Sequence, residues 1–111
     1  MGKYMFIYRG PVTPTDQVTE EEAARGMAEW LAWEARVGSA LVDDGAPFGA
    51  RACVHDDGSV APPAQLQGYG IVETRSLEDA VALAARHPFL SDNEGSRSVD
   101  VFELVDLDTE H

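Results

Sequence analysis

A run of apolar and aromatic residues fills residues 4–8, near the start of the sequence, and predicts a strand over residues 3–9. In an extended strand, successive side chains point to opposite faces of the sheet. One face would carry Tyr4, Phe6 and Tyr8, and the other would carry Met5 and Ile7. Because both sets are apolar, we expect both faces of the sheet to be covered. One layer of helices in so short a chain covers only one face, which predicts a second subunit on the other.

A helical pattern begins at Thr19, after proline and glycine in residues 10–14 break the first strand. Thr19 and Glu22 have the spacing of a capping box, and acidic residues lie at the positive end of the helix dipole. The predicted helix runs to about Val37 and stops at Gly38. Its inward stripe is predicted to consist of Ala23, Met27, Trp30, Leu31 and Val37, with Trp33 on the flank.

Residues 67–81 predict a strand that leads directly into a second helix. The strand is expected over residues 67–73, which include aromatic and β-branched side chains. Ser76 is a suitable N-cap for a helix over residues 77–86. His87 stops this helix, because a residue that precedes proline is biased away from helical geometry.

Two further strands are predicted, a short one at residues 39–43 and the last at residues 98–105, and the short strand is followed by a turn at residues 44–47. A small hairpin is predicted from residues 51–54 and 59–60, because the Asp57-Gly58 pair between them favours a tight turn. Residues 106–111 are predicted to form an acidic tail. This order of elements indicates one α+β domain over residues 1–111. Its expected architecture is ferredoxin-like βαββαβ, an antiparallel sheet with both helices on one face.

Composition narrows the function classes. The sequence of 111 residues carries 20 acidic against 8 basic side chains, a net charge of −12, which argues against binding to nucleic acid. No apolar run is long enough to span a bilayer, and the N-terminal residues lack the pattern of a signal peptide. Cys53 is the only cysteine, so no internal disulfide is expected. These features predict a cytoplasmic protein that does not act on a membrane.

Five segments, in this order and spacing, carry a family resemblance: residues 3–8, residues 30–33 followed by Gly38, residues 41–47, residues 67–73 and residues 99–103. Together they resemble the YCII-related proteins, in the branch often called DGPF-domain or PhnB-like. The resemblance covers nearly the whole chain. It implies a ferredoxin-like subunit that pairs as a dimeric α+β barrel, with a cleft between the sheet and the first helix.

The resemblance also bears on chemistry. In YCII proper, a histidine early in the first helix and an aspartate before a proline after the second helix form a proposed catalytic pair. The matching positions of this sequence hold Met27 and His87. Both residues of the pair are replaced, so that mechanism is not carried over.

The candidate catalytic residues are His87, Tyr8 and Glu73, and the candidate ligand-binding residues are Tyr8, Met27, Trp30 and Tyr69. We expect His87 to be a helix terminator with its ring in water, and its alternative role is a general acid or base. Glu73 and Glu103 either face inward with raised pKa values or lie in water at strand ends. The aromatic residues either line an apolar cleft or pack in the core or dimer interface.

Arginine and histidine residues add little to the functional prediction. Arg9 is expected at the surface, with recognition of an acidic ligand as the alternative. The three histidines are too scattered for a metal site, and no phosphate loop or nucleophile motif is present, so no metal or cofactor is expected.

The sequence therefore predicts a homodimeric protein that binds a small molecule or acts as an accessory protein. The alternative is a cofactor-independent enzyme, oxygenase- or lyase-like, that moves a proton with a residue of the cleft. A polar cleft residue in a perturbed environment would favour the enzyme. A cleft filled by Met27 and Trp30 would favour binding or a purely structural role.

Overall fold

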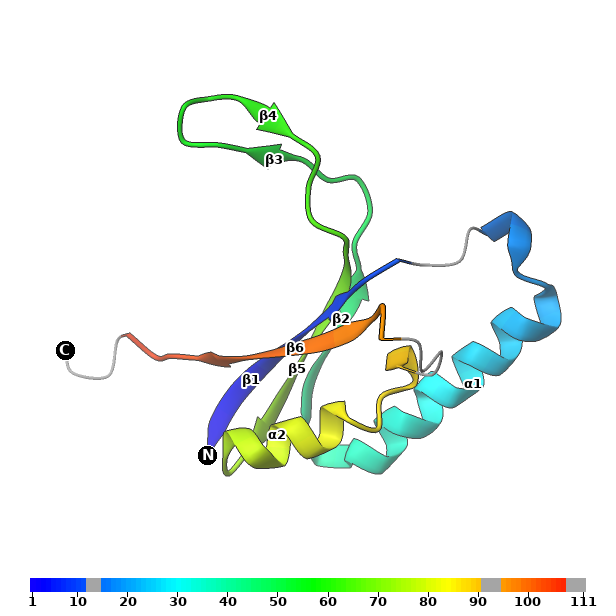
Figure 1. Cartoon of the computed structure of the whole chain (residues 1–111). Coiled ribbons are helices and arrows are strands. Elements are labelled where there is room, and N and C mark those ends of the chain that lie inside the picture. Colours follow the sequence, from blue (N-terminus) through cyan, green and yellow to red (C-terminus); the bar gives the residue numbers. More distant parts are fainter. Residues whose placement is uncertain (12–14, 91–94, 108–111) are drawn as a thin grey trace.

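The computed structural model of the protein describes residues 1–11, 15–90 and 95–107. It has an α+β fold with two helices and a four-stranded antiparallel sheet, as the order of elements predicted (Figure 1). The sheet comprises β1 (Gly2–Arg9), β2 (Leu41–Pro47), β5 (Leu66–Thr74) and β6 (Ser98–Leu104). The helices are α1 (Glu20–Val37) and α2 (Leu77–Ala84). Short 3-10 turns are η1 (Thr15–Gln17), η2 (Gly38–Ala40) and η3 (Pro88–Leu90).

Strand β1 is central in the sheet, whose order is β2-β5-β1-β6 with every neighbouring pair antiparallel. Phe6 of β1 lies opposite Gly70 of β5 and opposite Val101 of β6. The alternation predicted for β1 is confirmed, because Tyr4, Phe6 and Tyr8 are buried and the residues between them are only half-buried.

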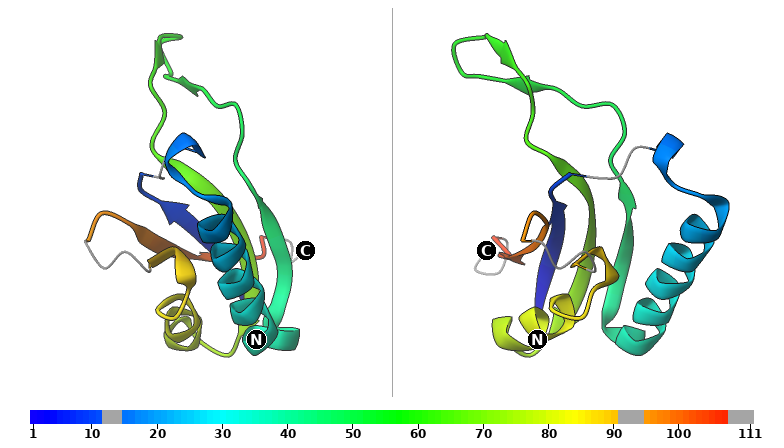
Figure 2. Two further views of the ribbon diagram at one scale, coloured as in Figure 1. Left: turned by 90° about the vertical axis from the view of Figure 1, so that its right-hand side faces the viewer. Right: turned by 45° about the vertical axis from the view of Figure 1, so that its right-hand side comes forward.

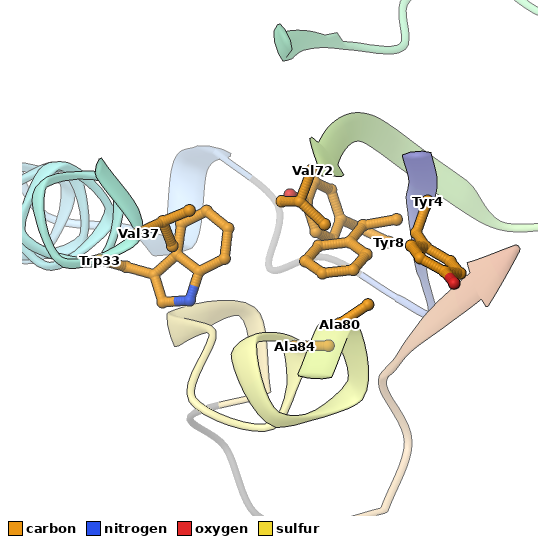
Figure 3. Close-up of a cluster of buried hydrophobic side chains, with 8 residues drawn as sticks. Tyr4, Tyr8, Trp33, Val37, Val72, Ala80 and Ala84 are labelled. Carbon is orange, nitrogen blue, oxygen red and sulfur yellow. The ribbon is translucent and has the colours of Figure 1, made fainter. Parts of the chain in front are cut away.

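Both helices contribute to one hydrophobic core on a single face of the sheet (Figure 3). Phe6 and Val72 from the sheet are fully buried there. Trp33 and Val37 come from α1, and Ala80 and Ala84 come from α2. The core thus fixes both helices to the face that carries Phe6 and Val72.

Helix α1 begins with the predicted capping box. The Thr19 hydroxyl accepts the Glu22 backbone N–H at 3.0 Å, and the Glu22 carboxylate accepts the Thr19 backbone N–H at 3.1 Å. Two backbone donors that the first turn cannot pair internally are thereby satisfied.

We expect Thr19→Ala to lower the free energy of unfolding by about 1 kcal/mol, because the Glu22 backbone N–H loses its acceptor. Urea denaturation measures the change. The control is Ser39→Ala, because Ser39 is exposed and lies outside the cap; it should leave the urea midpoint unchanged. Thr74→Ala would not serve as a control, because Thr74 is buried. A wild-type midpoint for Thr19→Ala would contradict the cap.

The predicted inward stripe of α1 is partly wrong. Trp33, which we expected on the flank, is 2% exposed, whereas Met27 and Leu31 are 60% and 55% exposed. The residues that pack against the core are Trp30, Trp33 and Val37, at spacings of three and four. Helix α1 diverges from the sheet towards its N-terminal end (Figure 2). Met27 and Leu31 instead line the space between this helix and the strands.

The turn predicted at residues 44–47 is also wrong, because these residues belong to β2. The register of β2 against β5 shifts on both sides of Asp43, so the strand carries a bulge there. Gly45 adopts φ 71°, and a Cβ on it would lie 1.7 Å from the Tyr69 carbonyl oxygen. Only glycine allows β2 to approach β5 this closely. The 3-10 turn η2 also delays the strand, which begins at Leu41 rather than residue 39.

Helix α2 ends at Ala84, two residues earlier than predicted. The chain continues as a tight turn in which the His87 backbone N–H donates to the Ala84 carbonyl. This turn carries His87 back towards the sheet rather than out into water. Strand β6 ends at Leu104, and the first residues of the predicted acidic tail are exposed. Residues 108–111 of that tail lie outside the described residues, as do residues 12–14 of the predicted strand break.

The predicted hairpin is confirmed and consists of β3 (Cys53–Val54) and β4 (Val60–Ala61). Gly58 adopts φ 88° in its turn, and the Ser59 backbone N–H donates to the Asp57 carboxylate. The hairpin projects away from the four-stranded sheet (Figure 1). At its base the Arg51 guanidinium donates to the Phe48 and Leu66 carbonyls, which ties the two arms together.

Candidate functional site

A cavity of about 590 Å³ lies between α1 and the sheet, where the helix diverges from the strands. Its walls come from α1, β1, β2, β5 and η3. Pockets that bind small organic ligands have volumes of about 300–1,000 Å³. The cavity is therefore large enough for a ligand, and Met27 and Trp30 line it without filling it.

Glycines keep the cavity open. Gly68 and Gly70 lie on the helix-facing side of β5; Gly68 lines the cavity, and the absence of a side chain on Gly70 leaves room for Tyr8. A Cβ on Gly70 would lie 3.2 Å from the Tyr8 hydroxyl oxygen, and one on Gly68 would lie 3.0 Å from the Ala46 carbonyl oxygen. Across the cavity, a Cβ on Gly26 of α1 would meet no atom within 4 Å. The cavity thus depends on missing side chains on two facing elements.

An aromatic cluster forms the inner wall. The Tyr8 ring lies 5.3 Å from the Trp30 ring in an edge-to-face arrangement and 5.5 Å from the Phe89 ring. These are the preferred separations of interacting aromatic side chains. Because the three residues come from β1, α1 and η3, the cluster joins the elements that surround the cavity.

His87 lies behind this wall, with its ring 4.6 Å from Tyr8, 4.3 Å from Trp30 and 4.4 Å from Trp33. It is 2% exposed, so the expectation of a ring in water is wrong. The tight turn after Ala84 and the packing of two indole rings on the imidazole explain the difference.

Burial lowers the pKa of His87 to about 4, so the ring is neutral at neutral pH and does not act as a cation at the helix end. Its Nδ1 accepts the Phe89 backbone N–H at 3.0 Å. The proton of the neutral ring therefore resides on Nε2, which is buried and has no hydrogen-bond partner among the described residues.

Tyr8 faces the cavity, and its pKa is raised by burial and, to a lesser extent, by the negative charge of Glu34. The phenol therefore stays protonated well above neutral pH. Glu34 lines the cavity from α1 and was not among the predicted site residues. Its position was available from helical spacing, because Glu34 follows Trp30 by four residues and Met27 by seven.

The structure brings Tyr8, Met27 and Trp30, three of the candidate ligand-binding residues, together at the cavity. Tyr69 borders the cavity too, but it alternates with Gly68 and Gly70, so its ring points to the opposite face of the sheet. There it stacks on Phe48 with 6.1 Å between ring centroids.

The structure does not bring Glu73 to the cavity. It lies near the far end of β5, opposite Lys3 of β1, on the sheet face away from the helices. Glu103 is exposed on β6, so neither carboxylate is the buried inward group that one interpretation allowed. Arg9 is at the surface as expected, and it pairs with Asp100 at 3.2 Å.

Within residues 1–11, 15–90 and 95–107, no group of three His, Cys, Asp or Glu side chains is placed to hold a metal ion. Over the same ranges, no helix has the length and apolar character needed to cross a bilayer.

The sequence matches no protein-family model and no curated protein. The fold and the site alone therefore define the class. It is an α+β protein with an apolar, aromatic-walled cavity between its first helix and its sheet.

Proposed function

We propose that this protein binds a small organic molecule in the cavity between α1 and the sheet. The observation that carries the proposal is a space of about 590 Å³ lined by Tyr8, Met27 and Trp30 and kept open by Gly26 and Gly68. Largely apolar, preformed cavities with a few polar groups are the usual form of small-molecule sites.

The open cavity and the perturbed pKa of Tyr8 meet the condition that we set for an enzyme, but the directions of the pKa shifts support binding rather than catalysis. A general acid or base works best when its pKa lies near the working pH. Burial moves the pKa of Tyr8 up and that of His87 down to about 4, so each is held in its neutral form at neutral pH. His87 is further engaged at Nδ1 by the Phe89 backbone N–H.

A variant of α1 separates ligand binding from stability. Gly26 is an exposed helical residue that lines the cavity, and a side chain there would enter free space. Gly26→Leu should raise helix stability by about 1 kcal/mol, because glycine is a poor helix former, yet it should obstruct the cavity. In a thermal-shift screen against a metabolite library, we expect ligands that stabilise the wild type to lose their effect on Gly26→Leu.

The matched control is Ala28→Leu, which adds a similar side chain on the same helix at an exposed position that does not line the cavity. It should keep the wild-type response to each ligand. Equal responses of Gly26→Leu and the wild type would place the ligand elsewhere, and a library that stabilises neither would leave the cavity without a binding role.

The subunit architecture that we propose is ferredoxin-like, in a homodimer that forms an α+β barrel. Without the hairpin strands, the sheet order runs second, third, first, fourth, which is the order of the split βαβ plan. The resemblance to YCII-related proteins also supports a ferredoxin-like homodimer. We propose in addition that the protein is cytoplasmic.

The sheet face away from the core supports the dimer. Its centre is apolar: Met5 and Ile7 of β1, Ile71 of β5 and Phe102 of β6. Its margins are charged, with Lys3 opposite Glu73 at one end and Arg9 paired with Asp100 at the other. An apolar centre within a charged rim is typical of protein interfaces. A second copy of the same face satisfies this pattern, because it presents the same apolar centre.

Phe102→Asp tests the dimer. Phe102 is 56% exposed on this face, so the variant should fold but place a charge in the apolar centre. In sedimentation velocity at micromolar concentration, we expect a wild-type dimer and a monomeric variant. Val105→Asp, at an exposed position just beyond β6, is the control and should stay dimeric. A monomeric wild type would refute the proposal.

A second candidate function is a cofactor-independent enzyme that transfers a proton in the cavity. One observation favours it: the phenol of Tyr8 and the carboxylate of Glu34 line the same cavity. Because the phenol stays protonated, its role would be that of an acid. Tyr8→Phe keeps the ring, so loss of turnover of a bound compound without loss of its affinity would favour the enzyme.

A further inference from the structure

The charged side chains that line the cavity in the described part of the chain are both acidic. Glu34 reaches it from α1 and Asp44 from β2, so carboxylates stand on two different walls. Among the described residues that line the cavity, none is lysine, arginine or histidine. These walls therefore offer no positive group to an anionic ligand.

The Glu34 carboxylate is the more informative of the two. Glu34 is a half-buried residue, and its carboxylate forms no ion pair with any described residue. A carboxylate beside an apolar cavity gains from a positive partner that binds there, because the lower dielectric of the cavity strengthens the attraction. Asp44 is exposed and adds negative charge at the cavity mouth.

The aromatic wall of the cavity also attracts positive charge. Tyr8, Trp30 and Phe89 line the cavity, and the faces of aromatic rings carry negative charge that attracts cations. The protein already contains one such contact, since the Arg97 guanidinium lies 5.4 Å from the centre of the Phe89 ring. Arg97 itself does not line the cavity.

We infer that the ligand is a small organic cation, an amine or quaternary ammonium group joined to a flat apolar body. The apolar body would occupy the part of the cavity beside Gly68, and the cationic group would lie between Glu34 and the rings of Tyr8 and Trp30. This inference rests on the proposed binding function and names the chemical class of the ligand.

Three probes of nearly equal shape test the charge: 2-phenylethylamine, 2-phenylethanol and 3-phenylpropanoate. Isothermal titration calorimetry at pH 7 gives their affinities for the wild type. We expect the amine to bind about ten-fold more tightly than the alcohol, which corresponds to about 1.4 kcal/mol, and the carboxylate to bind least.

Glu34→Gln should remove most of the advantage of the amine over the alcohol while leaving the affinity for the alcohol unchanged. Glu29→Gln is the matched control, because it makes the same change on the same helix at an exposed position away from the cavity. It should keep the wild-type preference, which separates a contact with Glu34 from the effect of net charge.

Equal affinities for the amine and the alcohol, or an unchanged preference in Glu34→Gln, would overturn the inference and leave small-molecule binding intact. Failure of all three probes to bind would also overturn it. The binding function itself would fall only if the metabolite screen found no ligand sensitive to Gly26→Leu.

Discussion

Acidification from pH 7 to pH 5 is expected to destabilise the wild type by about 2 kcal/mol through His87 alone. A histidine of the unfolded chain takes up a proton near pH 6.5, whereas burial holds the pKa of folded His87 at about 4. Between these values the unfolded state binds the extra proton, so protonation favours unfolding. The stability is complete above pH 6.5 and is lost progressively as the pH falls towards 4.

His87→Asn isolates this contribution in urea denaturation at the two pH values. The asparagine carbonyl can replace Nδ1 as acceptor for the Phe89 backbone N–H, but it does not titrate. The variant should therefore lose about 2 kcal/mol less than the wild type on acidification. His55→Asn, in the exposed hairpin turn, is the control and should match the wild type. Parallel pH profiles for wild type and His87→Asn would contradict the burial of this ring.

Replacement of Trp33 by alanine should lower the free energy of unfolding by about 4 kcal/mol, because it empties the centre of the core. Trp33 is 2% exposed and packs against Phe6 with 6.2 Å between ring centroids. Its indole N–H also donates to the Leu83 carbonyl at 3.0 Å and so ties α1 to α2. Urea denaturation monitored by circular dichroism measures the loss.

Two further variants show how much of this loss is due to the hydrogen bond and how much is specific to Trp33. Trp33→Phe keeps an aromatic ring but removes the donor, and should cost about 1–2 kcal/mol. Trp30→Ala, at a half-buried position beside the cavity, should cost less than Trp33→Ala. A larger loss for Trp30→Ala would contradict the placement of Trp33, rather than Trp30, at the centre of the core.

Features set by neighbouring residues were predictable from the sequence. The capping box needs only Thr19 and Glu22, and the hairpin turn needs only Asp57-Gly58. The two-sided pattern of β1 follows from alternation within one strand. Each is a local property, so no knowledge of distant contacts was required.

Features set by contacts between distant parts of the chain were not predictable from the sequence. Alternation shows that Gly68 and Gly70 share one face of β5, but not which face meets the helices. The glycine face proves to be the buried one, because the Tyr8 side chain occupies the space above Gly70. Tyr69 and Glu73 consequently lie on the open face rather than at the cavity.

The burial of His87 and Trp33 has a similar origin. The tilt of α1 against the sheet decides which of its residues meet the core, and that tilt follows from packing across the whole domain. The turn after Ala84 then brings the His87 ring into contact with both tryptophans of α1. A histidine before a proline gives no local signal of this environment.

The two tryptophans show directly whether the cavity is a binding site. Trp30 lines the cavity, whereas Trp33 is buried with its indole N–H bonded to the Leu83 carbonyl. In a ¹H–¹⁵N spectrum the protein should give two indole signals, one for each of its 2 tryptophans. Titration with a ligand from the thermal-shift screen should shift the Trp30 signal strongly and the Trp33 signal little. A saturating ligand that leaves the Trp30 signal in place would contradict binding in this cavity.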